Sequence, residues 1–285
     1  MRATADNLLP PVVSVITACF NDGKYLPQAV ASFARHAPDY CELIIVNDGS
    51  TQAKTQRVLH RLAQHGFSVL DLPHGGLSQA RNAGIKAARG RYILPLDADN
   101  RLGAGYIEQA IAVLEIRPEI GVVYSDCREF GIVEQYRHAP EFALPEMLRQ
   151  PAIDACAVFR KQLWQDCGGY DERLSAWSDW ELWLNAAKNG WQFHHLPAAL
   201  FEYRRRDDSL GANISLDELR ATLELLTTKH ATLYRQHRPD LLDEQGRPTT
   251  AWLRQIQPPP RRHGRLRLAL WRFKQKARRS LNTRT

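Results

Sequence analysis

The sequence predicts an α/β fold organised around a parallel β-sheet. Short apolar runs rich in β-branched residues alternate with segments in which apolar residues recur at helical spacing. Two of these runs, residues 12–19 and 43–46, end in polar turns at 21–23 and 47–50. This alternation favours a parallel sheet, which carries its ligand-binding groups at the carboxyl ends of its strands.

The alternation is regular over the first 100 residues. We expect strands over residues 12–19, 43–46, 67–70 and 92–96, separated by helices around 26–33, 58–63 and 80–87. The last of these strands runs directly into Asp97. Polar and acidic residues therefore follow several strands at the point where ligand groups are expected.

The pattern is weaker after residue 100. The expected elements are a helix over residues 106–114, a strand over 122–124, loop-rich sequence to about 151, a helix over 180–188 and a helix over 216–234. The helix over 180–188 ends at Asn189-Gly190, a typical stop signal. Three prolines at 258–260 then separate the last helix from the C-terminal tail.

The net charge of +7 is confined to that tail. Residues 261–285 hold ten Lys or Arg and no acidic residue, whereas the rest of the chain holds 28 basic and 31 acidic side chains. One helical face of the tail is apolar and consists of Leu266, Leu270, Phe273, Ala277 and Leu281. We expect residues 261–285 to contact an anionic membrane surface. Ten basic residues would also bind nucleic acid non-specifically, but the apolar face argues against a nucleic-acid partner.

The remaining composition indicates a cytoplasmic protein. Every apolar segment falls short of the roughly 20 residues that a transmembrane helix needs. The five cysteines are scattered without a Cys-x-x-Cys pair, which favours reduced thiols. The expected location is the cytoplasm, with the tail attached peripherally to the inner face of the cytoplasmic membrane.

The sharpest local motif is Asp97-Ala98-Asp99 at the end of the fourth strand. Two carboxylates separated by one residue can converge on one hard cation, and oxygen ligands favour Mg²⁺ or Mn²⁺. Such a cation neutralises charge on the phosphate oxygens of a departing diphosphate. A solvated turn would give the same tripeptide, so its interpretation depends on the residues that accompany it.

Three residues near the ends of other elements favour a nucleotide site. Asp48 follows the second strand, where its carboxylate could accept the imide hydrogen of uracil, a donor that cytosine lacks. Phe20 follows the first strand and could stack on a base. Arg81 lies near the start of a helix, where phosphate binding is common. The alternatives are a turn residue, a core aromatic and a solvent-facing arginine.

Six short stretches, taken in order, resemble the inverting family 2 glycosyltransferases of the GT-A fold. They are VSVITACFN at 13–21, ELIIVNDGS at 42–50, ARNAGI at 80–85, LDAD at 96–99, GGYDE at 168–172 and DWELW at 179–183. The resemblance covers about residues 11–210. Six ordered matches are far more specific than any one of them.

The resemblance implies a GT-A domain over residues 1–210. Its Rossmann-like nucleotide-binding half, with a mixed central sheet, would cover residues 11–100, and its acceptor-binding half would cover 101–210. A C-terminal helical region over 211–257 and the basic amphipathic tail over 258–285 would follow.

The resemblance also implies roles for the matching donor-site residues. Ala18, Phe20 and Asp48 would line the nucleobase pocket, and Arg81 would face the ribose and the phosphates. The implied donor is a nucleotide diphosphate sugar, with uridine as the preferred nucleoside because of Asp48.

Three acidic residues would carry the metal and the chemistry. Asp99 would be the principal ligand of Mn²⁺ or Mg²⁺, with Asp97 binding the metal or the donor. Asp179 would be the catalytic base. A sugar hydroxyl is a poor nucleophile, so a positioned carboxylate must take its proton as it attacks the anomeric carbon from the face opposite the diphosphate.

Four positions depart from the family pattern. Ser178 stands where a Glu usually precedes the base, and Phe20 replaces a common Tyr. Arg206 stands where a His often follows a Tyr-Arg pair, so Arg206 is expected to bind the donor through its phosphate. Asn100 replaces a frequent third Asp, so metal affinity is expected to be modest.

The expected function is hexosyl transfer from a nucleotide sugar to a glycan or lipid-linked acceptor in bacterial envelope polysaccharide synthesis. A nucleotidyltransferase would normally carry a glycine-rich, basic loop near its N-terminus, whereas the first loop here, residues 19–24, is short. A non-catalytic nucleotide-sugar-binding protein is the other alternative, because Ser178 and Arg206 deviate. Retention of Asp97, Asp99 and Asp179 favours the enzyme.

Overall fold

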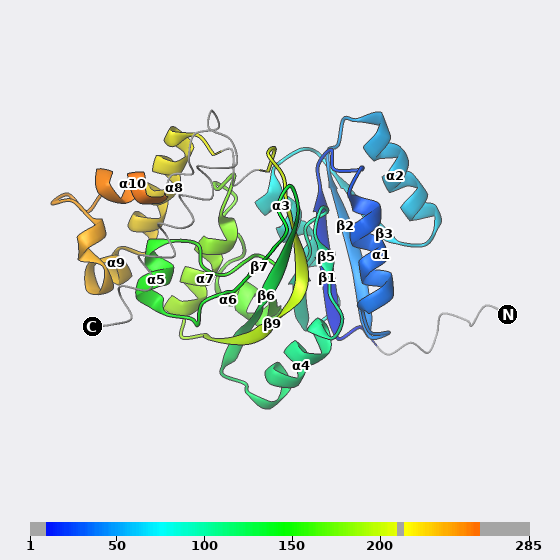
Figure 1. The fold of residues 1–285 in the computed structure, drawn as a ribbon, viewed down its shortest axis with the longest axis horizontal. Coiled ribbons are helices and arrows are strands. Elements are labelled where there is room, and N and C mark those ends of the chain that lie inside the picture. Colours follow the sequence, from blue (N-terminus) through cyan, green and yellow to red (C-terminus); the bar gives the residue numbers. More distant parts are fainter. Residues whose placement is uncertain (1–9, 210–213, 257–285) are drawn as a thin grey trace.

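The computed structural model describes residues 10–209 and 214–256 (Figure 1). The strands in this part of the chain are β1 Val13–Cys19, β2 Cys41–Asp48, β3 Ser68–Leu72, β4 Tyr92–Pro95, β5 Arg101–Leu102, β6 Ile120–Gly131, β7 Gln135–Arg137, β8 Val158–Arg160 and β9 Gln192–Arg205. The helices are α1 Leu26–His36, α2 Ala53–Gln64, α3 Leu77–Ala87, α4 Tyr106–Ile116, α5 Leu144–Arg149, α6 Lys161–Asp166, α7 Ser178–Lys188, α8 Leu216–Lys229, α9 Ala231–His237, the 3-10 turn η2 Pro239–Leu241 and α10 Thr250–Ile256.

One mixed sheet runs through the described residues. Its strands are hydrogen-bonded in the order β3-β2-β1-β4-β8-β6-β9-β5, and β7 pairs with β6. The first four strands in chain order are parallel, with Val13 of β1 opposite Cys41 of β2 and Tyr92 of β4. The next strand in the sheet, β8, is antiparallel to both β4 and β6. The alternating α/β pattern of the first 100 residues and the mixed central sheet are confirmed.

Two hydrophobic cores cover the two faces of the sheet. One core joins α1, α2 and α4 to the inner strands, and the other joins α3 and all the helices from α5 to α10. Figure 1 shows α5 to α10 gathered on the side remote from α1 and α2. Trp180 and Trp183 of α7 are fully buried in the second core. They stabilise the fold, so their aromatic rings are not available to stack on a sugar.

Small residues on α3 let this helix lie directly on β1 and β2. A Cβ atom at Gly84 would come 2.5 Å from Cγ2 of Ile16 and 3.0 Å from Cγ2 of Val46. Ala80 on the same face is also fully buried. This close approach fixes the position of Arg81, the next residue along the helix.

The structure corrects two expectations for the later part of the chain. The strand expected over 122–124 extends to Gly131, and its polar residues are paired inside the protein, as Asp126 is with His195 at 2.8 Å. The helix expected over 216–234 is two helices, α8 and α9, with a break at His230. A capping box between Ser215 and Glu218 starts α8.

The predicted membrane-binding tail lies outside the described residues. Within residues 10–209 and 214–256, none of the helices combines the length and the apolar character needed to cross a membrane.

Candidate functional site

The carboxyl ends of the parallel strands form one edge of the sheet, and the predicted site residues follow them there. Ala18 in β1 lies opposite Val46 in β2, and Cys19 lies opposite Asn47. Phe20 directly follows β1, and Asp48 is the last residue of β2. Asp97 follows β4, the other neighbour of β1. The structure therefore gathers the predicted nucleobase residues and the Asp97-Ala98-Asp99 motif at one edge, as the strand pattern predicted.

Asp48 is a buried acceptor whose oxygens bind the loop between β3 and α3. Its carboxylate accepts hydrogen bonds from the backbone N–H groups of Gly75 at 2.8 Å and Gly76 at 3.1 Å. Nδ1 of His74 lies 2.9 Å from Oδ2 of the same carboxylate. The ring of His74 stacks on Phe20, with centroids 4.0 Å apart and planes inclined by 16°. Phe20 itself is 40% exposed and so is not a core aromatic.

Arg81 is buried and forms an ion pair with Asp97, whose side chain is partly exposed. Nη2 of Arg81 lies 2.7 Å from Oδ1 of Asp97, and the arginine is 3% exposed. Burial lowers the pKa of Arg81, but the nearby charge of Asp97, with Tyr170 and Asp179 adding to it, outweighs burial and raises it. Arg81 is therefore not a solvent-facing arginine. It is a fixed positive charge within the electrostatic reach of both Asp97 and Asp179.

Asp99 is paired with an arginine from the far end of β9. Nε of Arg206 lies 3.0 Å from Oδ2 of Asp99, and Nη1 lies 2.6 Å from Oδ1 of Asp22 in the first loop. Burial raises the pKa of Asp99 to about 7, the charge of Asp97 adds to this rise, and Arg206 opposes it. Arg206 thus joins the first loop to the Asp97-Ala98-Asp99 turn. The ion pair that Asp22 makes with Arg206 was not predicted from the sequence.

Asn100 fixes the same turn to β9. Its Oδ1 atom accepts the backbone N–H of Arg204 at 2.9 Å, and Nε of Arg204 donates to the carbonyl of Asp99 at 2.9 Å. The side chain of Asn100, which replaces a third Asp of the family pattern, thus holds the turn that contains Asp99 against β9.

Asp179 lies in the first turn of α7. The preceding Trp177 has φ +57, a left-handed conformation that is unusual for a bulky residue and typical of functional turns. Burial raises the pKa of Asp179 to about 6; Asp154 and Asp97 raise it further, while Arg81 opposes the rise. A carboxylate with a pKa near 6 is matched to proton abstraction near neutral pH.

A buried polar network attaches α7 to the C-terminal helices. Oε1 of Glu181, two residues after Asp179, lies 2.9 Å from Nε2 of His230 and 2.9 Å from Nζ of Lys229. Lys229 also pairs with Asp171 at 3.0 Å. Glu181 and His230 are fully buried, so their pairing fixes the break between α8 and α9 against the helix that carries Asp179.

Two further residues near the site, Asp154 and Tyr170, were not assigned a role from the sequence. Asp154 precedes β8, its charge raises the pKa of Asp179, and it pairs with Arg137 of β7 at 2.8 Å. Tyr170 is buried beside Arg81, whose guanidinium lies 5.5 Å from the centre of its ring. The contacts of both residues join parts of the chain that are far apart in the sequence, so a linear pattern does not reveal them.

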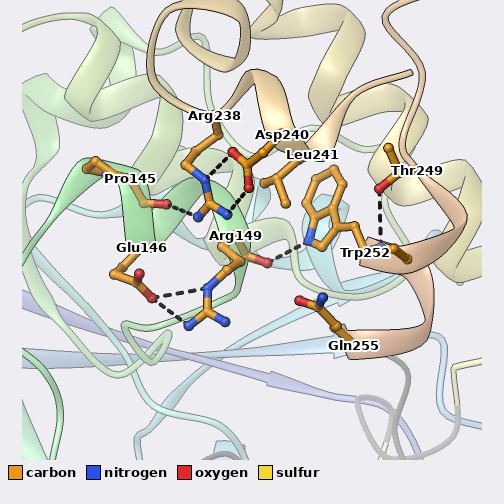
Figure 2. A pocket seen from close by; sticks show the side chains of 10 residues that line it. Pro145, Glu146, Arg149, Arg238, Asp240, Leu241, Thr249, Trp252 and Gln255 are labelled. Atoms are coloured by element: carbon orange, nitrogen blue, oxygen red, sulfur yellow. Dashed lines mark hydrogen bonds and ion pairs between the residues drawn. The ribbon is translucent and has the colours of Figure 1, made fainter. Parts of the chain in front are cut away.

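A separate hollow of about 370 Å³ lies among α5, η2 and α10 (Figure 2). Its charged residues are paired with one another: Arg149 with Glu146, and Arg238 with Asp240. The indole N–H of Trp252 donates to the carbonyl of Arg149 at 2.8 Å. The hollow contains none of the strand-edge residues, so it is separate from the candidate site.

Comparison with known proteins identifies what this arrangement is similar to. The family model for glycosyl transferase family 2 matches residues 14–166. A chondroitin synthase of Pasteurella multocida (strain Pm70) is 25% identical over 192 residues, which are 65% of this chain and 20% of that protein. The putative teichuronic acid biosynthesis glycosyltransferase TuaG of Bacillus subtilis (strain 168) is 26% identical over 212 residues, covering 71% of this chain and 82% of that protein. The chain spans about a fifth of the length of the Pasteurella multocida synthases that it matches.

Two solved structures share the fold. TarS of S. aureus (1–349) in complex with UDP-GlcNAc has a TM-score of 0.65 at 20% identity, over 78% of this chain and 69% of that chain. The mannosyltransferase PcManGT from Pyrobaculum calidifontis, in complex with GDP-Man and Mn²⁺, has a TM-score of 0.57 at 18% identity, over 79% of this chain and 70% of that chain. The GT-A fold expected from the sequence is confirmed.

Proposed function

This chain belongs to glycosyl transferase family 2, and from that premise we propose that it moves a sugar from a nucleotide diphosphate sugar to a hydroxyl of a glycan or lipid-linked acceptor, with inversion at the anomeric carbon. The observation that carries the proposal is the placement of Arg81 between two carboxylates. Arg81 is ion-paired with Asp97, at the end of β4, and lies within electrostatic reach of Asp179, at the start of α7. A phosphate-binding cation thus lies beside a carboxylate whose pKa is near 6.

The donor would lie along the strand edge. Ala18, Phe20 and Asp48 would receive the base, and Arg81 would receive the phosphates at the buried end of the site. The TarS structure holds UDP-GlcNAc and the PcManGT structure holds GDP-Man, so this fold binds sugars attached to either nucleotide. A carboxylate such as Asp48 accepts a ring N–H, which uracil carries and cytosine lacks, so we favour a UDP-sugar over a CDP-sugar for this chain. Guanine also carries a ring N–H, so GDP is the comparison to test.

Asp97 and Asp99 are suited to hold Mn²⁺ or Mg²⁺. Both offer hard carboxylate oxygens at one turn. Burial and the charge of Asp97 raise the pKa of Asp99 to about 7, and the positive charge of a bound cation would favour its ionised form. The described residues contain no group of three or more His, Cys, Asp or Glu side chains arranged for a metal. Protein ligands would therefore be these two carboxylates, and the donor diphosphate and water would complete the shell. When bound, the cation would neutralise negative charge on the leaving diphosphate.

The protein residues would divide the remaining work between binding and proton transfer. Asp179 would take the proton of the acceptor hydroxyl while that oxygen forms its bond to the anomeric carbon and the bond from this carbon to the diphosphate oxygen breaks. Arg81 would bind the phosphates and keep part of Asp179 ionised, since its charge lowers the pKa of that carboxyl. Arg206 would exchange Asp99 for a phosphate oxygen, as a guanidinium can bind either.

The acceptor side and the cellular role follow from the same proposal. TuaG is named for teichuronic acid biosynthesis, which favours a role in bacterial envelope polysaccharide synthesis for this chain too. Residues 101–210 would form the acceptor half, residues 211–257 would support α7, and residues 261–285 would attach the enzyme to the membrane surface. Flotation with anionic liposomes tests the last point: replacing Leu266, Leu270 and Phe273 by Ser is expected to abolish binding by the full chain, and equal binding by both forms would refute it.

Release of the nucleoside diphosphate tests the proposed reaction. The full chain, with Mn²⁺ and a panel of UDP- and GDP-sugars, is offered oligosaccharide and lipid-linked acceptors. We expect acceptor-dependent release with one class of nucleotide sugar and loss of roughly 10²-fold or more in Asp179→Asn. Unchanged release in that variant would mean that another residue is the base.

A further inference from the structure

The side chain of His74 lies where the base of a nucleotide donor is proposed to bind. It stacks directly on Phe20, with the ring centroids 4.0 Å apart. At this distance the two rings are in contact, so no third ring fits between them. Its Nδ1 atom lies 2.9 Å from Oδ2 of Asp48, the carboxylate proposed to recognise the base. One side chain therefore occupies two of the three proposed base contacts.

The hydrogen-bonding pattern of His74 resembles that of a base with a ring N–H. Nδ1 lies 2.9 Å from the carboxylate of Asp48 and 3.1 Å from its backbone carbonyl. Both atoms accept hydrogen bonds, so Nδ1 must carry the proton and donate. Uracil at N3 and guanine at N1 present the same group, an N–H within a flat ring, whereas cytosine and adenine present an acceptor nitrogen.

The surroundings of His74 allow its side chain to move away from Phe20 and Asp48. Its side chain is 53% exposed, whereas that of Asp48 is 4% exposed, so the histidine can rotate into solvent and the carboxylate stays in place. The loop does not depend on the imidazole, because the N–H groups of Gly75 and Gly76 bind the same carboxylate. Gly49 gives the loop room: it has φ +65, and a Cβ there would come 2.6 Å from the backbone N of His74.

We propose that His74 is an intramolecular occupant of the nucleobase pocket, and that a donor whose base carries a ring N–H displaces it from Phe20 and Asp48. This inference rests on the proposed function, because it takes the strand edge as the donor site. It adds a specificity-determining residue: the base must replace both the stacking contact and the N–H donated to Asp48. The free energy needed to displace His74 from the pocket therefore lowers the affinity for the donor.

Calorimetric titration of the full chain with UDP, GDP and CDP in Mn²⁺ tests the proposal with His74→Ala. Removing one stacking contact and one hydrogen bond to a carboxylate from the free protein is expected to tighten UDP binding about 10-fold, equivalent to about 1.4 kcal/mol. CDP is expected to bind more weakly than UDP to both proteins, since cytosine cannot donate to Asp48. His60→Ala, an exposed histidine on α2, is the matched control and is expected to leave every affinity unchanged.

Proton NMR of the histidine rings gives a second measurement. The stacked Phe20 ring is expected to shift the His74 resonances upfield in the free protein, and His74→Ala identifies them. Saturation with UDP is expected to move them downfield as the ring leaves Phe20.

Weaker UDP binding in His74→Ala would overturn the proposal, because His74 would then contribute to the complex. Equal affinity with unmoved histidine resonances would overturn it too, because the base would bind elsewhere. Binding of CDP as tight as that of UDP would contradict recognition through Asp48. If neither wild type nor variant binds any nucleotide, the proposed function itself fails, a result distinct from the other three.

Discussion

The transfer rate is predicted to fall on the acid side with a midpoint near pH 6, because Asp179 must be ionised to take a proton. Burial raises the pKa of this carboxyl to about 6, with Asp154 and Asp97 raising it further and Arg81 opposing them. The ionised form is the active base, so activity is present above this pH and is lost as the pH falls through it.

The size of the effect separates Asp179 from an ordinary carboxylate. With a pKa of about 6, roughly 90% of the side chains are ionised at pH 7 and roughly 10% at pH 5. The rate at pH 5 is therefore expected to be about one tenth of the rate at pH 7. A carboxylate with a pKa near 3.9 would remain more than about 90% ionised over this interval, and its rate would be nearly flat.

The assay is acceptor-dependent release of nucleoside diphosphate at saturating donor and Mn²⁺, measured between pH 5 and 8. Asp179→Asn is expected to lose the acidic limb together with most of the activity. A flat wild-type profile, or the same limb in the residual activity of Asp179→Asn, would refute the assignment of Asp179 as the base.

Protein stability provides an independent check on the same pKa. A rise of the pKa from 3.8 in the unfolded chain to about 6 in the folded chain means that the protein loses stability as the pH rises through this interval. Allowing for partial exposure to solvent, the loss is about 1–2 kcal/mol. Asp179→Asn is therefore expected to melt several degrees above wild type at pH 7.5 and at nearly the same temperature at pH 4. Equal melting temperatures at both values would contradict the raised pKa.

Three other substitutions test the residues around Asp179. Asp99→Ala is expected to abolish the metal-dependent part of UDP binding. If calorimetry still shows tighter UDP binding by the variant in Mn²⁺ than in chelator, Asp99 is not the metal ligand. Arg206→Ala is expected to tighten binding of Mn²⁺ alone several-fold, since it removes a competing cation 3.0 Å from Asp99; an unchanged Mn²⁺ affinity would show that Arg206 does not compete. His230→Ala leaves the buried Glu181 with one partner fewer and is expected to lower the free energy of unfolding in urea by about 3 kcal/mol. A change below about 1 kcal/mol would mean that Lys229 alone compensates the charge of Glu181.

The strand-end residues of the first half could be predicted from the sequence because local pattern and topology agree there. Apolar runs and polar turns locate the strands, and parallel strands end at one edge whatever the details of packing. Asp48 and Asp97 therefore fall where the pattern places them, and Phe20 follows β1 beside Asp48. The pattern does not reveal that Asp48 is already bound by His74, because that contact joins a strand end to a loop 26 residues later.

The second half depends on contacts that a linear pattern does not contain. β6 extends past Tyr124 because its polar residues find buried partners, and Asp126 does so with His195, 69 residues away. Helical spacing alone predicts one helix over 216–234, but His230 pairs with Glu181 of α7 and the helix breaks there. The charge of Asp154 raises the pKa of Asp179, an effect that depends on how β8 and α7 pack in three dimensions.

The most direct measurement is calorimetric titration of the full chain with UDP, and with GDP for comparison, in Mn²⁺ and then in chelator. We predict UDP binding that requires the metal. Metal-dependent binding of GDP in place of UDP would contradict the choice of base while leaving the transferase intact. Failure of both nucleotides to bind would contradict the claim that this strand edge is a donor site.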